Sequence, residues 1–218
     1  QRHWGLLLRR WGRPDESMDK LQRAADSFRH AGDALWLAYT LFHQAEVQLV
    51  FLNDQQRAMA LLNEAQTLFQ ELNYNRGFAD CANGLAEVHR AMGNLANAEE
   101  AYIASEAAFK RAGVDGAIVP MANRGLMKLE RSQFDEAHAL LEEVRDSMVG
   151  NQWARLMPFI NAGFLEIAAA RAEWDSWDTH EDALRISLER TPMAEPDLAA
   201  PLERAGDHAQ VEGETERA

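Results

Sequence analysis

Side chains that could perform acid–base or metal chemistry are scattered along the 218 residues rather than grouped. His43 and Glu46 stand three residues apart and would share one face of a helix, but two ligands do not hold a metal ion. None of the seven histidines belongs to the His-Glu-x-x-His pattern that binds zinc on a helix. Acidic neighbours such as Glu99 and Glu100 diverge by about 100° around a helix and are typical of solvated surface. The sequence therefore predicts no metal site and no cofactor.

Signatures of covalent and phosphoryl-transfer catalysis are also absent from the sequence. Cys81 is the single cysteine, and no histidine partner is set beside it, so we interpret it as a buried structural thiol. A lone cysteine fits a reducing, cytoplasmic compartment. The sequence contains no glycine-rich phosphate loop and none of the motifs of protein kinases. We therefore expect that this chain is not itself an enzyme.

The formal net charge of −13 is unevenly spread along the chain. Residues 1–31 carry seven Lys/Arg and four Asp/Glu, whereas residues 191–218 carry two and seven. A chain this acidic has no broad basic surface to neutralise phosphates, which argues against nucleic acid and anionic membranes as partners. No apolar run is long enough to span a bilayer. The acidity is interpreted either as solvated helix faces or as attraction to a basic segment of a partner.

A turn signal recurs along the chain at nearly constant spacing. Residues 84–113 are rich in Ala, Glu and Leu and are broken only at Gly93-Asn94, which predicts two helices joined by a tight turn. The break recurs at intervals of 41, 40, 39, 40 and 41 residues, at Gly12, Asn53, Gly93, Ser132, Ala172 and Gly213. Because one helix hairpin cannot bury both of its faces, this recurrence predicts a stack of hairpins.

Each break is followed by a small residue and then by an apolar stripe at helical spacing. Five residues after the breaks stand Ser17, Ala58, Ala98, Ala137, Trp177 and Ala218. At further steps of four, three and four residues stand Leu21, Leu62, Tyr102, Leu141 and Glu181, then Ala24, Ala65, Ser105, Val144 and Leu184, then Phe28, Phe69, Phe109, Met148 and Leu188. We expect the small residues to allow close helix approach and the large ones to wedge into the neighbouring hairpin.

The fifth repeat departs most from this pattern, with Trp177 and Glu181 at positions that are small and apolar elsewhere. Trp174 and Trp177 either mark a bend or a contact to another domain, or they are core residues of an ordinary packing variant. In the same repeat, Pro158 would interrupt a helix that starts at Trp153. The first helix of this repeat therefore either begins near Pro158 or kinks there.

With its period near 40 residues, the unit resembles the tetratricopeptide repeat (TPR) in its longer form. The segment RGFADCANGLAEVHRAMGNLANAEEAYIASEAAFKRAG, residues 76–113, also resembles the C-terminal repeat regions of large bacterial serine/threonine protein kinases and related signalling ATPases. The resemblance implies an all-α fold, a right-handed α-α superhelix (solenoid) of helix hairpins. We expect one array with a partial repeat at 1–32, full repeats at 33–73, 74–113, 114–150 and 151–191, and a truncated repeat at 192–218. The alternative for the last segment is a disordered acidic tail.

Stacked hairpins of this kind are expected to line a concave groove with their first helices. Counting from the breaks, the residues expected to face this groove are Thr40, His43, Gln44, Val47, Asp80, Asn83, Glu87, Arg90, Val119, Asn123 and Leu126. From these we predict a partner-binding groove formed by His43, Asp80, Asn83, Glu87, Arg90 and Asn123. The expected ligand is a peptide or helix of another protein, with a basic segment favoured by the acidic charge. The predicted function is a scaffold in a larger bacterial signalling protein; the alternative is an effector-sensing regulatory domain of a kinase, ATPase or transcription activator.

Overall fold

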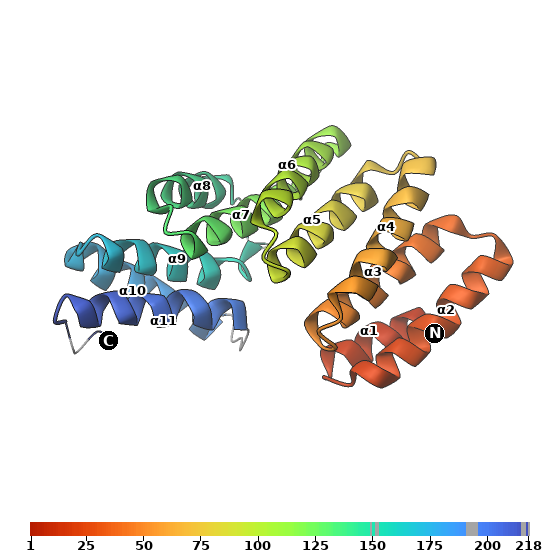
Figure 1. Cartoon of the computed structure of the whole chain (residues 1–218), viewed down its shortest axis with the longest axis horizontal. Coiled ribbons are helices and arrows are strands. Elements are labelled where there is room, and N and C mark those ends of the chain that lie inside the picture. Colours follow the sequence, from red (N-terminus) through yellow and green to blue (C-terminus); the bar gives the residue numbers. More distant parts are fainter. Residues whose placement is uncertain (149, 151–152, 191–195, 215–216, 218) are drawn as a thin grey trace. The chain divides into compact units, whose positions relative to one another are not determined.

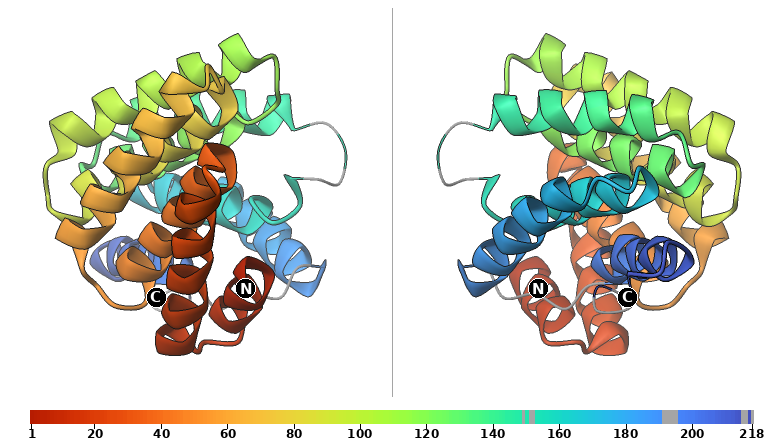
Figure 2. Two further views of the ribbon diagram at one scale, coloured as in Figure 1. Left: turned by 90° about the vertical axis from the view of Figure 1, so that its right-hand side faces the viewer. Right: turned by 90° about the vertical axis from the view of Figure 1, so that its left-hand side faces the viewer.

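The structure is a computed structural model that describes residues 1–148, 150, 153–190, 196–214 and 217 (Figures 1 and 2). Over this part of the chain every regular element is a helix. The helices are α1 (Arg2–Arg10), α2 (Pro14–Ala31), α3 (Ala34–Val50), α4 (Gln55–Glu71), α5 (Asn75–Ala91), α6 (Leu95–Ala112), α7 (Ile118–Glu130), α8 (Phe134–Ser147), α9 (Met157–Ala170), α10 (Trp174–Arg190) and α11 (Pro196–Val211). The predicted all-α fold of helix hairpins is confirmed. The repeat position predicted at Ala218 lies outside the described residues.

The predicted breaks are the points at which the backbone turns into the left-handed region. Gly12, Gly93 and Gly213 have φ between 66° and 83°, and the non-glycine residues Asn53, Ser132 and Ala172 have φ between 51° and 55°. A second series of left-handed residues follows the second helices: Gly32, Asn73 and Gly113 stand within two residues of the ends of α2, α4 and α6, and Gly150 comes three residues after α8. A left-handed residue after the last turn redirects the chain, because the helix cannot continue through it. The repeat is therefore punctuated twice per hairpin by the same backbone device.

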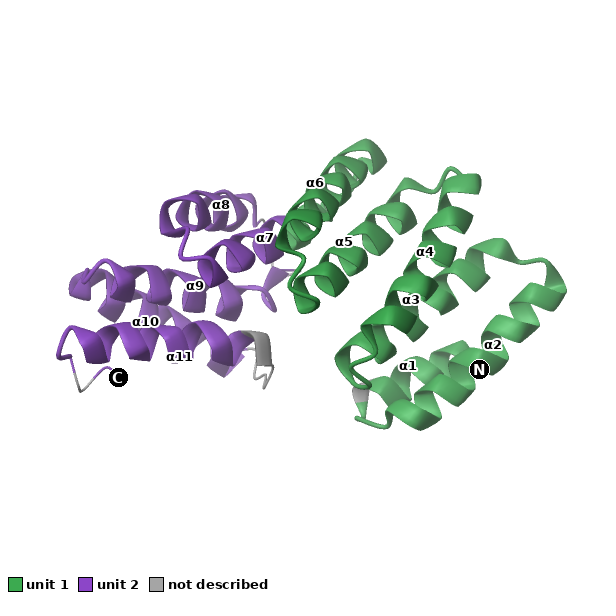
Figure 3. Ribbon diagram, viewed as in Figure 1, with its two compact units in different colours: residues 1–120 green, residues 121–218 purple. Residues whose placement is uncertain are grey.

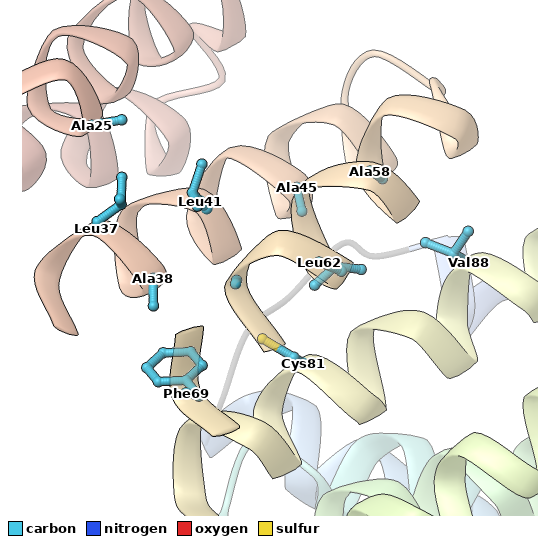
Figure 4. Close-up of a cluster of buried hydrophobic side chains, with 11 residues drawn as sticks. Ala25, Leu37, Ala38, Leu41, Ala45, Ala58, Leu62, Phe69, Cys81 and Val88 are labelled. Atoms are coloured by element: carbon cyan, nitrogen blue, oxygen red, sulfur yellow. The ribbon is translucent and has the colours of Figure 1, made fainter. Parts of the chain in front are cut away.

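The chain forms two compact units, unit 1 (Gln1–Pro120) and unit 2 (Met121–Ala218) (Figure 3). In unit 1, α3 packs between α2 and α4, and α5 packs between α4 and α6. A core cluster joins these hairpins, with Ala25 from α2, Leu41 from α3, Leu62 and Phe69 from α4 and Cys81 from α5 (Figure 4). Each hairpin thus buries its apolar stripe against the next hairpin of the unit, as the repeat pattern predicts.

Small residues mark the places where the helices come closest. Ala58 and Ala98 are fully buried at the predicted small position. A methyl group added at Gly84 of α5 would come within 2.9 Å of Leu62 of α4, which shows that the leucine fills the space beside the glycine. In unit 2, a methyl group on Gly163 would come within 2.7 Å of Leu141. The prediction that large residues of one hairpin wedge into the next is confirmed at both sites.

In unit 2, α9 begins at Met157, so Pro158 stands in its first turn, where no intrahelical N–H bond is lost. The alternative in which this helix starts at Trp153 is therefore wrong. Trp177 is buried in a cluster with Ala162 and Leu184, and its indole Nε1–H donates to Glu181 over 3.1 Å. The interpretation of Trp177 as an ordinary core residue is confirmed. Glu181 itself is exposed at a position that is apolar in the other repeats.

The last described helix, α11, packs on α9 through a buried ion pair. The Arg204 guanidinium donates from Nε and Nη2 to the two carboxylate oxygens of Glu166, over 2.7 Å and 2.8 Å. Burial raises the pKa of Glu166 even though Arg204 favours its charged form. The segment 196–211 is thus a first helix with its own tertiary contacts, and the break at Gly213 follows it. Residues 192–195, 215–216 and 218 of the predicted terminal repeat lie outside the described residues.

Candidate functional site

The first helices of unit 1 lie next to one another, because α1 contacts α3 and α3 contacts α5. Each of them carries polar and aromatic side chains at spacings of three, four and seven residues, which places them on one side of the helix. We call the following set the first-helix face: Arg2 and Arg9 of α1; Trp36, Tyr39, His43 and Glu46 of α3; and Arg76, Asp80, Asn83, Glu87 and Arg90 of α5. Every one of these residues is partly or well exposed.

Charged side chains connect α1 to α3 on this face. The Glu46 carboxylate forms an ion pair with Arg9, and its Oε2 lies 2.7 Å from Nδ1 of His43. The other ring nitrogen of His43, Nε2, lies 3.5 Å from Nη2 of Arg2. Glu46 is therefore already neutralised by groups of the same molecule. This leaves its carboxylate less able to attract a ligand cation than an unpaired one.

Aromatic rings form the neighbouring part of the face. The guanidinium carbon of Arg2 lies 4.6 Å from the ring centroid of Trp36 and 5.8 Å from that of Tyr39. The Tyr39 hydroxyl donates to the Tyr74 hydroxyl over 3.0 Å, and burial together with this bond raises the pKa of Tyr39. Beside Trp36 is a pocket of about 160 Å³ lined by Gln1, Arg2, His3, Phe28 and Trp36.

Asp80 of α5 has the most perturbed carboxylate on this face. Its pKa is raised to about 6, mainly because partial burial disfavours the charged form and secondly because Glu46 repels it, while Arg76 opposes both effects. No described residue donates a hydrogen bond to this carboxylate or forms an ion pair with it at contact distance. At neutral pH a desolvated negative charge therefore faces α3 without a direct partner.

Glu87 and Arg90 form an ion pair about two to three turns further along α5. Nε and Nη2 of Arg90 donate to Oε2 of Glu87 over 3.1 Å and 2.9 Å. The other oxygen, Oε1, accepts from the hydroxyl of Tyr102, a fully buried residue of α6. Asn83 lies half-buried on the same side of α5. Glu87 thus helps to fix α6 on α5 besides contributing to the face.

The structure places five of the six predicted groove residues, His43, Asp80, Asn83, Glu87 and Arg90, on α3 and α5 of unit 1. The sixth, Asn123, is a half-buried residue of α7 in unit 2. The further expectation that Thr40, Gln44 and Val47 face the groove is wrong, because all three are buried. Gln44 donates instead to Gln22 of α2 over 3.0 Å, within the hairpin stack.

An extra residue after α3 explains this error. After α5, the N–H of Asn94 bonds to the carbonyl of His89, five residues earlier, whereas after α3 the N–H of Asp54 bonds to Gln48, six residues earlier. Counting back from the break by the same number of residues therefore assigns to the face residues of α3 that lie one position too far along the chain, an error of about 100° around the helix. The correct equivalents of Asp80 and Glu87 are Tyr39 and Glu46, which the sequence analysis missed. Arg2, Arg9, Trp36 and Arg76 were missed as well, and their three-, four- and seven-residue spacings were the available signal.

The described residues hold no group of three or more His, Cys, Asp or Glu side chains arranged to bind a metal ion. Cys81 is buried, and desolvation raises the pKa of its thiol, with Asp80 as a smaller cause, which makes the thiolate unfavourable. No helix within the described part of the chain combines the length and apolarity needed to cross a membrane. The first-helix face presents charged groups, hydrogen-bonding groups and aromatic rings.

Comparison with known proteins agrees with the fold of helix hairpins. Residues 78–148 match the family model described as tetratricopeptide repeat. The fold is similar to the crystal structure of BtubC (BKLC) from P. vanneervenii, with a TM-score of 0.71 and 16% sequence identity, over 94% of this chain and 86% of that one. No curated protein matches the sequence. At such identity the structural similarity speaks for the fold alone. Residues 78–148 are therefore similar to tetratricopeptide repeats, which generally mediate protein–protein interaction, and the fold of the described residues is that of an α-α solenoid of helix hairpins.

Proposed function

We propose that this chain is a protein-interaction scaffold that binds a peptide or helix on the first-helix face of unit 1. The observation that carries the proposal is the Asp80 carboxylate, which is partly desolvated and has no direct partner among the described residues. Ionisable groups in such environments cluster at functional sites, because a structure selected only for stability would pair or expose them. A cationic or hydrogen-bond-donating group of a ligand would complete the environment of Asp80.

The form of the face suits an elongated ligand. Three successive first helices contribute to it, so a peptide lying across them would make several contacts, none of which needs to be strong. The polar residues that flank Asp80, namely His43, Asn83, Glu87 and Arg90, can bond backbone amides and carbonyls of such a peptide. Asn123, the sixth predicted groove residue, lies on α7 of unit 2, and its contact with a partner stays a prediction.

A small effector is the less favoured ligand. The pocket beside Trp36 measures about 160 Å³, whereas cavities for drug-sized molecules measure about 300–1,000 Å³. The acidic net charge of the chain favours a ligand with a basic segment. Because Glu46 and Glu87 are already paired with arginines of this chain, Asp80 is the carboxylate through which that preference would act.

The resemblance of residues 76–113 to repeat regions of bacterial kinases and signalling ATPases supports a regulatory role. In this proposal the repeats belong to a larger cytoplasmic bacterial signalling protein, and they position a partner protein or another segment of the parent. No catalytic role is assigned to the first-helix face, because its groups are arranged for recognition and no nucleophile is activated among them.

Site-specific photo-crosslinking would test the location of the binding site. A benzophenone amino acid would replace Asn83 on the first-helix face or Asn63, an exposed residue on the outer side of α4. After irradiation in a bacterial lysate, mass spectrometry would identify the crosslinked proteins. We expect adducts that form at position 83 and not at position 63. The same adducts at both positions would show that the face is not the binding site.

A matched pair of triple variants would then measure the contribution of the face to affinity for the crosslinked partner. The first is Asp80→Asn, Asn83→Ala and Glu87→Gln, in which glutamine keeps an acceptor for the buried Tyr102 hydroxyl. The control changes three exposed residues of the outer side of α4, Gln56→Ala, Asn63→Ala and Gln70→Ala. The first variant should bind about tenfold or more weakly and the control as the wild type. Equal affinities would refute the proposed function.

A further inference from the structure

We propose that the first-helix face recognises an arginine side chain of its ligand, which Trp36 and Tyr39 contact through their rings and Asp80 through its carboxylate. In the unliganded protein, Arg2 of the chain itself occupies the aromatic part of this place. The inference rests on the proposed function, because it names the ligand chemistry of the same face. It adds to that function the residue type that is recognised, arginine, the side chains that contact it, and Arg2 as a competing group of the same chain.

The position of Arg2 shows that the aromatic pair accepts a guanidinium. A cation within about 6 Å of an aromatic centroid is attracted by the ring, and Arg2 meets this condition for both Trp36 and Tyr39. The ring centroids of Trp36 and Tyr39 lie 5.9 Å apart and the ring planes are inclined by 41°, so the two rings can contact one planar group from two directions. Trp36 remains 41% exposed, which leaves ring surface accessible from solvent.

Arg2 itself is an incompletely satisfied occupant. Its Nε is buried and has no hydrogen-bond acceptor, and its contact with His43 is long at 3.5 Å. Burial also lowers the pKa of Arg2, which means that the charged form loses hydration there. Leaving a buried donor without an acceptor is unfavourable. A ligand arginine that approaches from solvent could stack on the same rings and also find a carboxylate.

Asp80 supplies that carboxylate from the neighbouring helix. Asp80 occupies on α5 the position equivalent to that of Tyr39 on α3, and the two helices contact each other, so Asp80 lies beside the α3 part of the face. A guanidinium offers a planar fork of N–H donors that can bond both oxygens of one carboxylate, whereas lysine offers a single strongly hydrated charge. The combination of rings and carboxylate therefore favours arginine over lysine.

The distance between packed helices indicates how far apart the arginines of a peptide probe should stand. Packed helices lie about 8–10 Å apart, and an extended peptide advances about 3.3 Å per residue, so every third side chain would reach the next first helix. A suitable probe is a fluorescent nonapeptide of Gly and Ser with arginine at every third position. Two matched probes carry lysine or glutamine at the same positions.

Fluorescence anisotropy at low ionic strength would compare the three probes on the wild type and on variants. The arginine probe should bind about threefold to tenfold more tightly than the lysine probe and at least tenfold more tightly than the glutamine probe. Asp80→Asn and Trp36→Ala should each weaken the arginine probe about tenfold. Their controls, Asp26→Asn on α2 and Trp11→Ala at the end of α1, are exposed outside the face and should bind as the wild type.

Arg2→Ala tests the role of Arg2 as a competing occupant. Removing a competitor from the site raises the fraction of molecules able to bind, so the arginine probe should bind about threefold more tightly to this variant. Circular dichroism of each variant would verify that the helices are intact. Equal binding of the arginine and glutamine probes would overturn the arginine inference while leaving peptide binding to the face in place. Absence of binding by all three probes would overturn it as well, and the crosslinking experiment would then decide the proposed function separately.

Discussion

Asp80→Asn is expected to make the folded protein more stable at neutral pH, although it removes a charge from the proposed binding face. The pKa of Asp80 rises from 3.8 to about 6 on folding, chiefly because burial disfavours the carboxylate. The folded state therefore binds the Asp80 proton more tightly than the unfolded state does. Asparagine has the same shape and no charge to desolvate, so the variant avoids this penalty.

The size and pH dependence of the effect follow from this difference in pKa. One pKa unit corresponds to about 1.4 kcal/mol, so ionised Asp80 lowers the free energy of unfolding by at most ~3 kcal/mol above about pH 6.5. We expect a measured gain of about 1–3 kcal/mol in the variant near pH 7.5, since the site is partly solvated. The penalty is absent below about pH 3, where both states are protonated, and it grows as the pH rises through the interval between the unfolded and the folded pKa. The gain should thus be about half as large near pH 5.

Urea unfolding followed by far-ultraviolet circular dichroism would measure these free energies at both pH values. The groups that act on Asp80 are Arg76 on α5 and Glu46 and Tyr39 on α3, and none of them is changed in the variant. Asp26→Asn, an exposed change on α2, serves as the control and should leave the unfolding midpoint unchanged at both pH values. A variant no more stable than the wild type near pH 7.5, or a gain that does not shrink at lower pH, would refute the reasoning.

Three further predictions concern the architecture. Ala172→Gly should raise the free energy of unfolding by about 0.5–1 kcal/mol, because Ala172 has φ 53°, whereas Gly93→Ala at an equivalent break should lower it by about 1 kcal/mol. Urea titrations would measure both changes, and changes of the same sign would argue against the left-handed turns. Ala98→Leu should lower the free energy of unfolding by about 1–3 kcal/mol, because it overpacks a fully buried contact between helices. Glu100→Gln, at an exposed position, should have little effect on the thermal midpoint. Equal midpoints for the two variants would mean that the helices do not approach closely at Ala98. Glu166→Gln should speed amide hydrogen exchange in α11 more than in α10, because it removes the charge that holds Arg204, and uniform exchange rates would contradict this role.

The repeat was readable from sequence because its punctuation and its packing pattern are local. A left-handed turn depends on the conformation of one residue, so glycine at positions 93 and 213 identified equivalent breaks in distant parts of the chain. The alternation of small and large residues along one helix face likewise follows from helix geometry alone, and it correctly predicted the contact of Leu62 with the next hairpin. For this reason five of the six predicted groove residues lie on first helices of unit 1, as expected, while their role in binding stays a prediction.

The orientation of α3 was not readable from the breaks, since one extra residue in the loop that ends at Asp54 shifts the whole helix by about 100° relative to the count. That shift buries Thr40 and Val47 and brings Tyr39 and Glu46 to the face instead. An extra residue in the loop leaves the spacing of residues within α3 unchanged. Only the packing of α3 against α2 and α4 shows which side of this helix is covered.

Tertiary structure also decided which of the polar groups are available to a ligand. Glu46 and Asp80 are both acidic residues on first helices, yet the first is paired with Arg9 of α1, whereas the second has no contact partner among the residues that the structure describes. The sequence alone determined that such residues stand on helices repeated about every 40 positions. Whether a carboxylate is neutralised depends on side chains that reach it from other helices, such as Arg9 from 37 residues away in the chain, and this is set by how the hairpins stack.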